Sequence, residues 1–193
     1  NVAVGADALE ANTTASYNTA VGYNSMKDTT TGANNTALGG RSLTANTTGD
    51  SNTALGDYAL TTNTTASNNT AVGTQALRYN TTGSGNVAVG QDALKDNTTG
   101  TQNVSVGRNC LSNNTTASYN VAIGHNTLET NTTGAANVGV GDGVLNANTG
   151  GSNTAVGHRA MLSNTTGNNN VAMGVYSLDA NTTGFQNVAV GYA

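Results

Sequence analysis

The motif Asn1-Val2-Ala3-Val4-Gly5 returns along the chain every 17 residues, with one spacing of 16, until residues 187–191. Copies begin at Asn1, Asn18, Asn35, Asn52, Asn69, Asn86, Asn103, Asn120, Asn137, Asn153, Asn170 and Asn187, which gives eleven full units and part of a twelfth. A fixed period of this length is the signature of a repeat architecture. We therefore expect residues 1–193 to form one continuous array, cut as a window from a longer repeat protein.

The motif alternates in the manner of a short β-strand, with positions two and four of each unit on one face and positions one, three and five on the other. A unit of 17 residues is too short for a helical hairpin repeat of about 34 residues. It fits one coil of a solenoid, whose coils fold only by stacking on their neighbours. The predicted fold is all-β, a parallel β-solenoid (β-roll) of eleven 17-residue coils, one of them with 16, plus a partial coil.

Two positions in each unit carry the large apolar side chains. Position four is always aliphatic, and position nine is always Leu or Met, near which we expect a second short extended piece. Burial of such side chains is the main favourable contribution to folding. They predict a continuous inner seam formed by Val4, Leu9, Val21, Met26, Leu38, Leu43, Leu55, Leu60, Val72, Leu77, Val89, Leu94, Val106, Leu111, Ile123, Leu128, Val140, Leu145, Val156, Met161, Met173, Leu178 and Val190.

On the opposite face of the predicted strand, Asn occupies position one, Ala occupies position three except at Ser105 and Gly139, and Gly always occupies position five. Small side chains allow another backbone to approach closely. One interpretation is a lateral interface between identical rods, formed by Ala3, Gly5, Ala20, Gly22, Ala37, Gly39 and their equivalents. The alternative is that the glycines turn a corner of the coil with positive φ. The sequence leaves both open.

Composition excludes several classes of function. The chain is 8% charged with a net charge of -4, so it offers no basic surface to nucleic acid. No apolar run approaches the roughly 20 residues of a membrane-spanning helix, and we expect no membrane insertion in this segment. Every charged residue falls at a variable position of the unit, consistent with a narrow interior free of charge.

The sequence Asn-Thr-Thr at positions twelve to fourteen matches the acceptor pattern for N-glycosylation. The candidates are Asn12, Asn46, Asn63, Asn80, Asn97, Asn114, Asn131, Asn164 and Asn181. Both irregular units, with Thr29 in place of Asn and with a residue missing after Thr149, differ at this corner. We expect the corner to lie outside the packed seam, either carrying glycans or serving as a plain turn.

Catalytic motifs are missing from the sequence. His125 and His158 share position six in different coils without a repeating acidic partner, and both are expected to be exposed to solvent. The single cysteine, Cys110, replaces a small residue at position eight and cannot form an intramolecular disulfide. No nucleophile elbow, phosphate-binding loop or zinc spacing is present. We expect no catalytic residue, no cofactor and no metal site, and hence no enzyme.

The pattern Asn-Val/Thr-Ala-Val-Gly, followed by a small residue and Leu, resembles the head repeats of trimeric autotransporter adhesins, whose units carry a similar Ser-Val-Ala-Ile-Gly strand. It is also similar to the Asn-Thr-Ala-Val-Gly repeats of phage tail-fibre and bacterial surface proteins that end in an intramolecular chaperone domain. The resemblance covers the whole chain. It implies a left-handed parallel β-roll, trimerisation, a position outside the cell on a cell or virion surface, and an adhesive or spacer role.

These observations lead us to expect a structural extracellular fibre or filament shaft, built by self-association of identical chains as a homotrimer or a filament and decorated by glycans at position twelve. One alternative is a glycan- or host-binding adhesin or tail-fibre module, which would gather its Tyr and Phe rings on one exposed edge. A second alternative is an ice-binding solenoid, suggested by the Thr columns at positions thirteen and fourteen.

Overall fold

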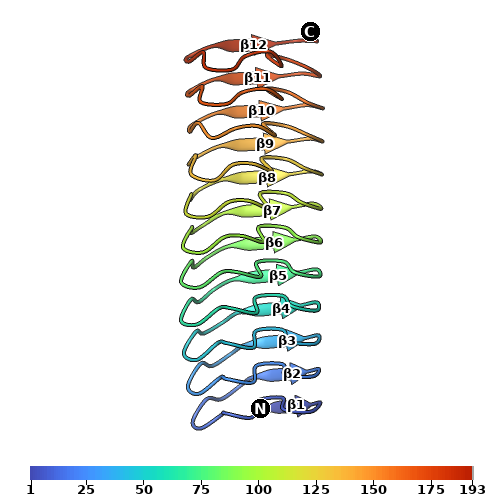
Figure 1. The fold of residues 1–193 in the computed structure, drawn as a ribbon, viewed down its shortest axis with the longest axis vertical. Coiled ribbons are helices and arrows are strands. Elements are labelled where there is room, and N and C mark those ends of the chain that lie inside the picture. Colours follow the sequence, from blue (N-terminus) through green and yellow to red (C-terminus); the bar gives the residue numbers. More distant parts are fainter. Residues whose placement is uncertain (193) are drawn as a thin grey trace.

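The computed structural model of the chain describes residues 1–192, and the last residue of the predicted array, Ala193, lies outside them. Twelve parallel strands form one sheet in sequence order, and the coils stack into a straight rod (Figure 1). This confirms the predicted β-solenoid. The strands are β1 (Val2–Val4), β2 (Thr19–Val21), β3 (Thr36–Leu38), β4 (Thr53–Leu55), β5 (Thr70–Val72), β6 (Val87–Val89), β7 (Val104–Val106), β8 (Val121–Ile123), β9 (Val138–Val140), β10 (Thr154–Val156), β11 (Val171–Met173) and β12 (Val188–Val190).

Equivalent positions face one another across every strand pair. In β4 and β5, for example, Thr53 pairs with Thr70 and Leu55 pairs with Val72. The short ninth unit keeps this register, since Thr154 of β10 still pairs with Val138 of β9. The omitted residue belongs to the corner after Thr149 and not to the strand, so β9 and β10 remain in register.

The strand faces are reversed relative to the prediction. Position three points into the coil, and from the second coil to the eleventh its side chain is fully buried, as in Ala71. Position four points outward and is buried in none of the twelve strands. The expected seam therefore excludes Val4, Val21, Leu38, Leu55, Val72, Val89, Val106, Ile123, Val140, Val156, Met173 and Val190.

Position nine forms the inner seam as predicted. Its side chain is buried from Leu9 to Met161, and Leu178 packs against the same core. No second strand surrounds it, because positions six to eleven form consecutive turns and position nine has positive φ, 51° at Leu77. The left-handed conformation costs a residue with a side chain roughly 1–2 kcal/mol. Burying the Leu side chain contributes about 1.5–3 kcal/mol, which offsets that cost.

The corner glycines settle which interpretation of the small face is correct. Gly73 has a φ of 131°, and a Cβ atom added to it would lie 2.6 Å from the carbonyl oxygen of Gly90 in the next coil. The close approach therefore occurs between coils of one chain. The lateral interface expected at Ala3, Gly5, Ala20, Gly22, Ala37 and Gly39 is wrong, because position three lies inside the coil and position five turns its corner.

Candidate functional site

The asparagines at position twelve lie inside the rod, which corrects the expectation that this corner stands outside the packed interior. Asn80 is fully buried, and its Nδ2 atom donates to the Oδ1 atom of Asn63 and to the carbonyl oxygen of Gly83, both at 2.9 Å. The Nδ2 atom of Asn97 in turn donates to the Oδ1 atom of Asn80 at 2.8 Å. The same pattern links Asn46, Asn63, Asn80, Asn97 and Asn114 into a ladder along the rod axis.

A second ladder runs through the asparagines at position one. The Oδ1 atom of Asn69 accepts a hydrogen bond of 2.9 Å from the backbone N–H of Asn86 in the next coil. The Nδ2 atom of Asn69 donates to the carbonyl oxygen of Gly83 at 3.0 Å, so this oxygen accepts from both asparagines of its coil. The two ladders explain how a thin interior holds two polar side chains per coil, since buried polar groups are tolerated when they are hydrogen-bonded.

Burial leaves no room for a glycan in the folded coil at seven of the nine candidate asparagines. The acceptor asparagines Asn46, Asn63, Asn80, Asn97, Asn114, Asn131 and Asn164 are all fully buried, while Asn12 and Asn181 in the end coils are partly buried. Sugar attaches to the Nδ2 atom, which in the buried ladder serves as a donor within the fold. The Asn-Thr-Thr corner is thus a structural element of the coil.

The threonines that follow have two different roles. At position thirteen, the Oγ1 atom of Thr81 donates to the carbonyl oxygen of Thr98 in the next coil at 2.9 Å. At position fourteen, Thr82 and its equivalents are exposed. Only one column of free hydroxyl groups therefore remains at this corner, which weakens the reason for considering an ice-binding surface there.

The outer face of the strands is a uniform surface that runs along the rod. It consists of two columns, Val or Thr at position two and Val, Leu, Ile or Met at position four, and neither column contains a charged residue. Leu38 is 51% exposed and Ile123 is 40% exposed. Contiguous apolar patches beyond a few hundred Å² are uncommon on monomeric soluble proteins and mark interaction surfaces.

A polar row crosses the turns at position six of four successive coils. An Nη2 atom of Arg108 lies 2.7 Å from Nε2 of His125, and Nδ1 of His125 lies 2.9 Å from Oδ1 of Asp142. The other oxygen of Asp142 lies 3.5 Å from Nε2 of His158. The sequence analysis placed both histidines at the surface but missed Asp142 between them. A comparison of position six in successive coils would have shown this acidic residue.

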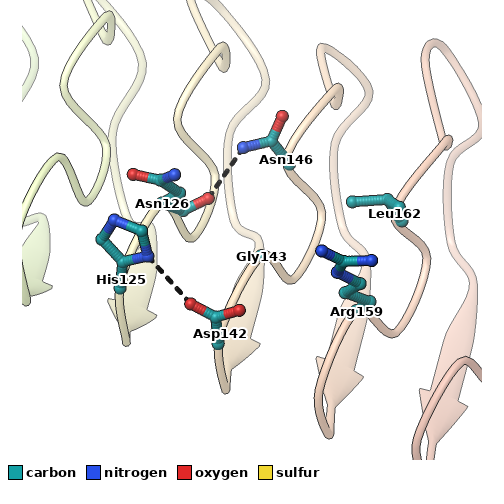
Figure 2. A pocket seen from close by; sticks show the side chains of 7 residues that line it. All are labelled: His125, Asn126, Asp142, Gly143, Asn146, Arg159 and Leu162. Atoms are coloured by element: carbon teal, nitrogen blue, oxygen red, sulfur yellow. Dashed lines mark hydrogen bonds and ion pairs between the residues drawn. The ribbon is translucent and has the colours of Figure 1, made fainter.

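The polar row borders a surface hollow of about 360 Å³, lined by His125, Asn126, Asp142, Gly143, Asn146, Arg159 and Leu162. Figure 2 shows these side chains around the opening, with His125 turned toward Asp142. The Nδ2 atom of Asn146 closes one side by donating to the backbone oxygen of Asn126 at 3.0 Å. Among residues 1–192, no hydroxyl group lies within hydrogen-bond distance of either histidine ring, so the hollow lacks an activated nucleophile.

A second hollow of about 340 Å³ lies at the opposite corner, beside Gly85 and Tyr119. Both hollows open where glycine interrupts a column of side chains, Gly143 at position seven and Gly85 at position seventeen. Both glycines have positive φ, 64° and 72°, like the residues with side chains at these positions in other coils. The hollows therefore follow from missing side chains and not from a change in the coil.

The aromatic rings are unevenly distributed over the turns. Tyr23, Tyr58, Tyr79, Tyr176 and Tyr192 lie on the edge formed by positions six to eleven, whereas Tyr17, Tyr119 and Phe185 lie at the corner of positions sixteen and seventeen. Three rings of the first edge alternate with Arg41 and Arg78 in the second to fifth coils. We name Tyr23, Arg41, Tyr58, Arg78 and Tyr79 the Tyr–Arg ladder.

The part of the chain that the structure describes contains no helix long and apolar enough to cross a membrane. It also contains no group of three or more His, Cys, Asp or Glu side chains placed to hold a metal ion. Comparison with family models, with curated proteins and with solved structures finds no match for this chain.

Proposed function

We propose that the chain is a shaft segment of an extracellular fibre, assembled by self-association of identical copies through the outer face of the strands. The observation that carries this proposal is the pair of uncharged columns at positions two and four, which run from β1 to β12 on one side of the rod. The extracellular position rests on the resemblance of the strand motif to adhesin heads and tail-fibre repeats.

The size of this face reaches the lower limit for a specific contact. Twelve strands spaced about 4.8 Å apart, each three residues long at about 3.3 Å per residue, give a face of roughly 500 Å². Two copies would bury about 1,000 Å² in total, close to the area that separates specific interfaces from adventitious contacts. Because every copy repeats its coils at the same spacing, side chains at position four of one copy can pack between those of another along the whole length.

The regular pattern of the outer strand face indicates that its partner is a second copy of the chain. A partner with an unrelated surface would match the regular columns over a few coils only, whereas a second copy presents the same period and the same absence of charge. The polar turns and the exposed Thr column at position fourteen keep the other sides of the rod hydrated. A structural role also agrees with a core whose buried side chains serve to pack each coil on its neighbours.

Association can be tested by sedimentation equilibrium over a range of protein concentrations. We expect the wild-type chain to form oligomers, and the double variant Val72→Lys/Val106→Lys to dissociate because it buries unpaired charges in the interface. The matched control Thr82→Lys/Thr116→Lys carries the same charges at position fourteen and should associate as the wild type does. The measured mass also gives the number of copies. A wild-type chain that stays monomeric at its highest soluble concentration contradicts the proposal.

A further inference from the structure

The Tyr–Arg ladder is a continuous stack of rings and guanidinium groups. The central carbon of the Arg41 guanidinium lies 5.7 Å from the ring centre of Tyr23 and 5.0 Å from that of Tyr58. The same carbon of Arg78 lies 4.7 Å from the ring centre of Tyr58 and 4.9 Å from that of Tyr79. Each arginine therefore makes cation–π contacts with two rings.

Hydrogen bonds fix the two guanidinium groups further. An Nη1 donor of Arg41 bonds to the hydroxyl oxygen of Tyr58, and Nη1 of Arg78 donates to Oε1 of Gln75 at 2.9 Å. These bonds engage Nη1 of each arginine and leave the edge formed by Nε and Nη2, and such an edge can bind carboxylate in a bidentate way. Since the side chains are already ordered, a ligand would meet little further entropic cost on binding.

Neither guanidinium has a carboxylate partner in the protein. Among residues 1–192, no Asp or Glu oxygen lies within 4.0 Å of Arg41 or Arg78, although the chain has ten acidic residues and only six Lys and Arg. Lys27, by contrast, lies 3.2 Å from a carboxylate oxygen of Glu10. Asp57 precedes Tyr58 in the chain but extends toward Gly40, where its Oδ1 atom would lie 2.8 Å from an added Cβ.

We propose that the Tyr–Arg ladder binds a polysaccharide that carries carboxylate groups. The exposed faces and edges of the outer rings, Tyr23 at 52% and Tyr79 at 40% exposure, offer the flat apolar contact that a sugar ring requires. Arg41 and Arg78 belong to coils two steps apart, which is about 10 Å along the rod. That separation suits carboxylates on alternate sugars of a chain lying along the rod axis.

The inference is independent of the shaft proposal, because the ladder lies on the turns and the association face lies on the strands. Its test is isothermal titration calorimetry of the whole chain with a galacturonic acid hexamer, compared with the same hexamer fully methyl-esterified. We expect saturable binding of the acid that weakens as salt is raised, and binding at least about tenfold weaker for the neutral ester, since the ester cannot accept charge-assisted hydrogen bonds.

Variants locate the site. The double variant Arg41→Lys/Arg78→Lys keeps both positive charges but loses the planar guanidinium groups, which bind carboxylate through two hydrogen bonds and stack on the rings. It should weaken binding of the acid about tenfold or more. Tyr58→Ala should weaken it similarly, whereas Tyr58→Phe keeps the ring between the two arginines and should bind within about threefold of wild type. The controls Arg108→Lys and Tyr17→Ala change an arginine and a tyrosine outside the ladder and should bind as wild type does. Unfolding midpoints of all variants verify that they fold.

Three results would overturn the assignment. The first is equal binding of the acid and the ester, which would remove the role of the guanidinium groups. The second is unchanged binding by Arg41→Lys/Arg78→Lys or equal weakening by Arg108→Lys, either of which would move binding elsewhere. The third is competition by a glutamate hexamer as strong as that of the sugar, which would make the ladder a site for acidic peptides.

Discussion

The Nδ2 atom of Asn80 lies 2.9 Å from the Oδ1 atom of Asn63 in the preceding coil and donates a hydrogen bond to it. This contact joins two coils at a corner that contains no strand, by a side chain that is fully buried. Repeated along the rod, it cross-links the side of each coil that the sheet does not reach. The solenoid is thus held on one side by strand pairing and on the other by backbone hydrogen bonds, such as that from Thr81 N–H to the carbonyl oxygen of Thr98, together with the asparagine amides.

Replacement of Asn80 should destabilise the rod strongly. Asn80→Ala removes the donor to Asn63 and to the carbonyl oxygen of Gly83 and the acceptor for Asn97. Buried polar groups that lose a partner cost about 1–3 kcal/mol each, so we expect a loss of about 3 kcal/mol in the free energy of unfolding. Urea denaturation followed by circular dichroism measures it.

The control for this variant is Thr82→Ala, two residues away, whose side chain is exposed. It should change the free energy of unfolding by no more than about 0.5 kcal/mol. Because repeat arrays do not always unfold in one step, hydrogen exchange of the amides in residues 52–102 provides a local measure. Equal effects of the two substitutions would show that the amide ladder does not stabilise the rod.

The second coil contains a natural gap in the ladder, where Thr29 occupies position twelve and its buried Oγ1 atom has no hydrogen-bond partner. Thr29→Asn would supply an acceptor for Nδ2 of Asn46 and a donor to Asn12 and to the carbonyl oxygen of Gly32, as in the other coils. Each buried hydrogen bond contributes about 0.5–1.5 kcal/mol, so we expect stabilisation of about 2 kcal/mol. The reciprocal change Asn46→Thr should destabilise, and a drop in the unfolding midpoint of Thr29→Asn would contradict the ladder.

The period and the spacing of the motif predicted the parallel, in-register sheet, because a strand repeated every 17 residues can pair in few other ways. Which face of the strand lies inside the coil could not be predicted from the size of its apolar side chains. The interior is so thin that Leu77 and two asparagines nearly fill a coil, leaving space at position three only for a residue as small as Ala71 or Ser105. A sequence signal existed: position three never exceeds Ser in size, whereas position four varies among Val, Leu, Ile and Met.

The surface rows were harder to foresee. The row from Arg108 to His158 lies at a single position of the unit and can be read coil by coil. The Tyr–Arg ladder cannot, because its members occupy positions six, seven, ten and eleven. Their contact depends on the turns that bring position seven of one coil, Tyr58, against position ten of the next, Arg78.

Among residues 1–192, position five should tolerate a side chain only where no neighbouring backbone lies against it. In Gly73→Ala, the added Cβ would lie 2.6 Å from the carbonyl oxygen of Gly90, whereas Gly191 has no atom within 4 Å of this site. Both glycines have nearly the same φ, 131° and 133°, so alanine introduces about the same backbone strain in both variants. We expect Gly73→Ala to lower the unfolding midpoint far more than Gly191→Ala, and equal midpoints would show that coil packing does not require glycine.

The stability of the chain in alkali should depend on Cys110. Burial raises the pKa of its thiol from an ordinary value near 9 to about 11, and a hydrogen bond with Ser105 opposes this only in part. Below pH 9 the thiol is protonated in both states. Between pH 9 and 11 the unfolded chain loses the proton first, so the free energy of unfolding falls as pH rises, by about 2 kcal/mol across this range.

Cys110→Ala isolates this effect, because alanine already occupies position eight in coils such as those of Ala76 and Ala93, where it is fully buried. The two proteins differ only at position 110, so the difference between the two curves reports the thiol alone. We expect wild type to lose stability relative to Cys110→Ala as pH rises from 9 to 11, measured by urea denaturation at each pH. Parallel curves would mean that the thiol ionises equally in both states, and hence that position eight is open to water.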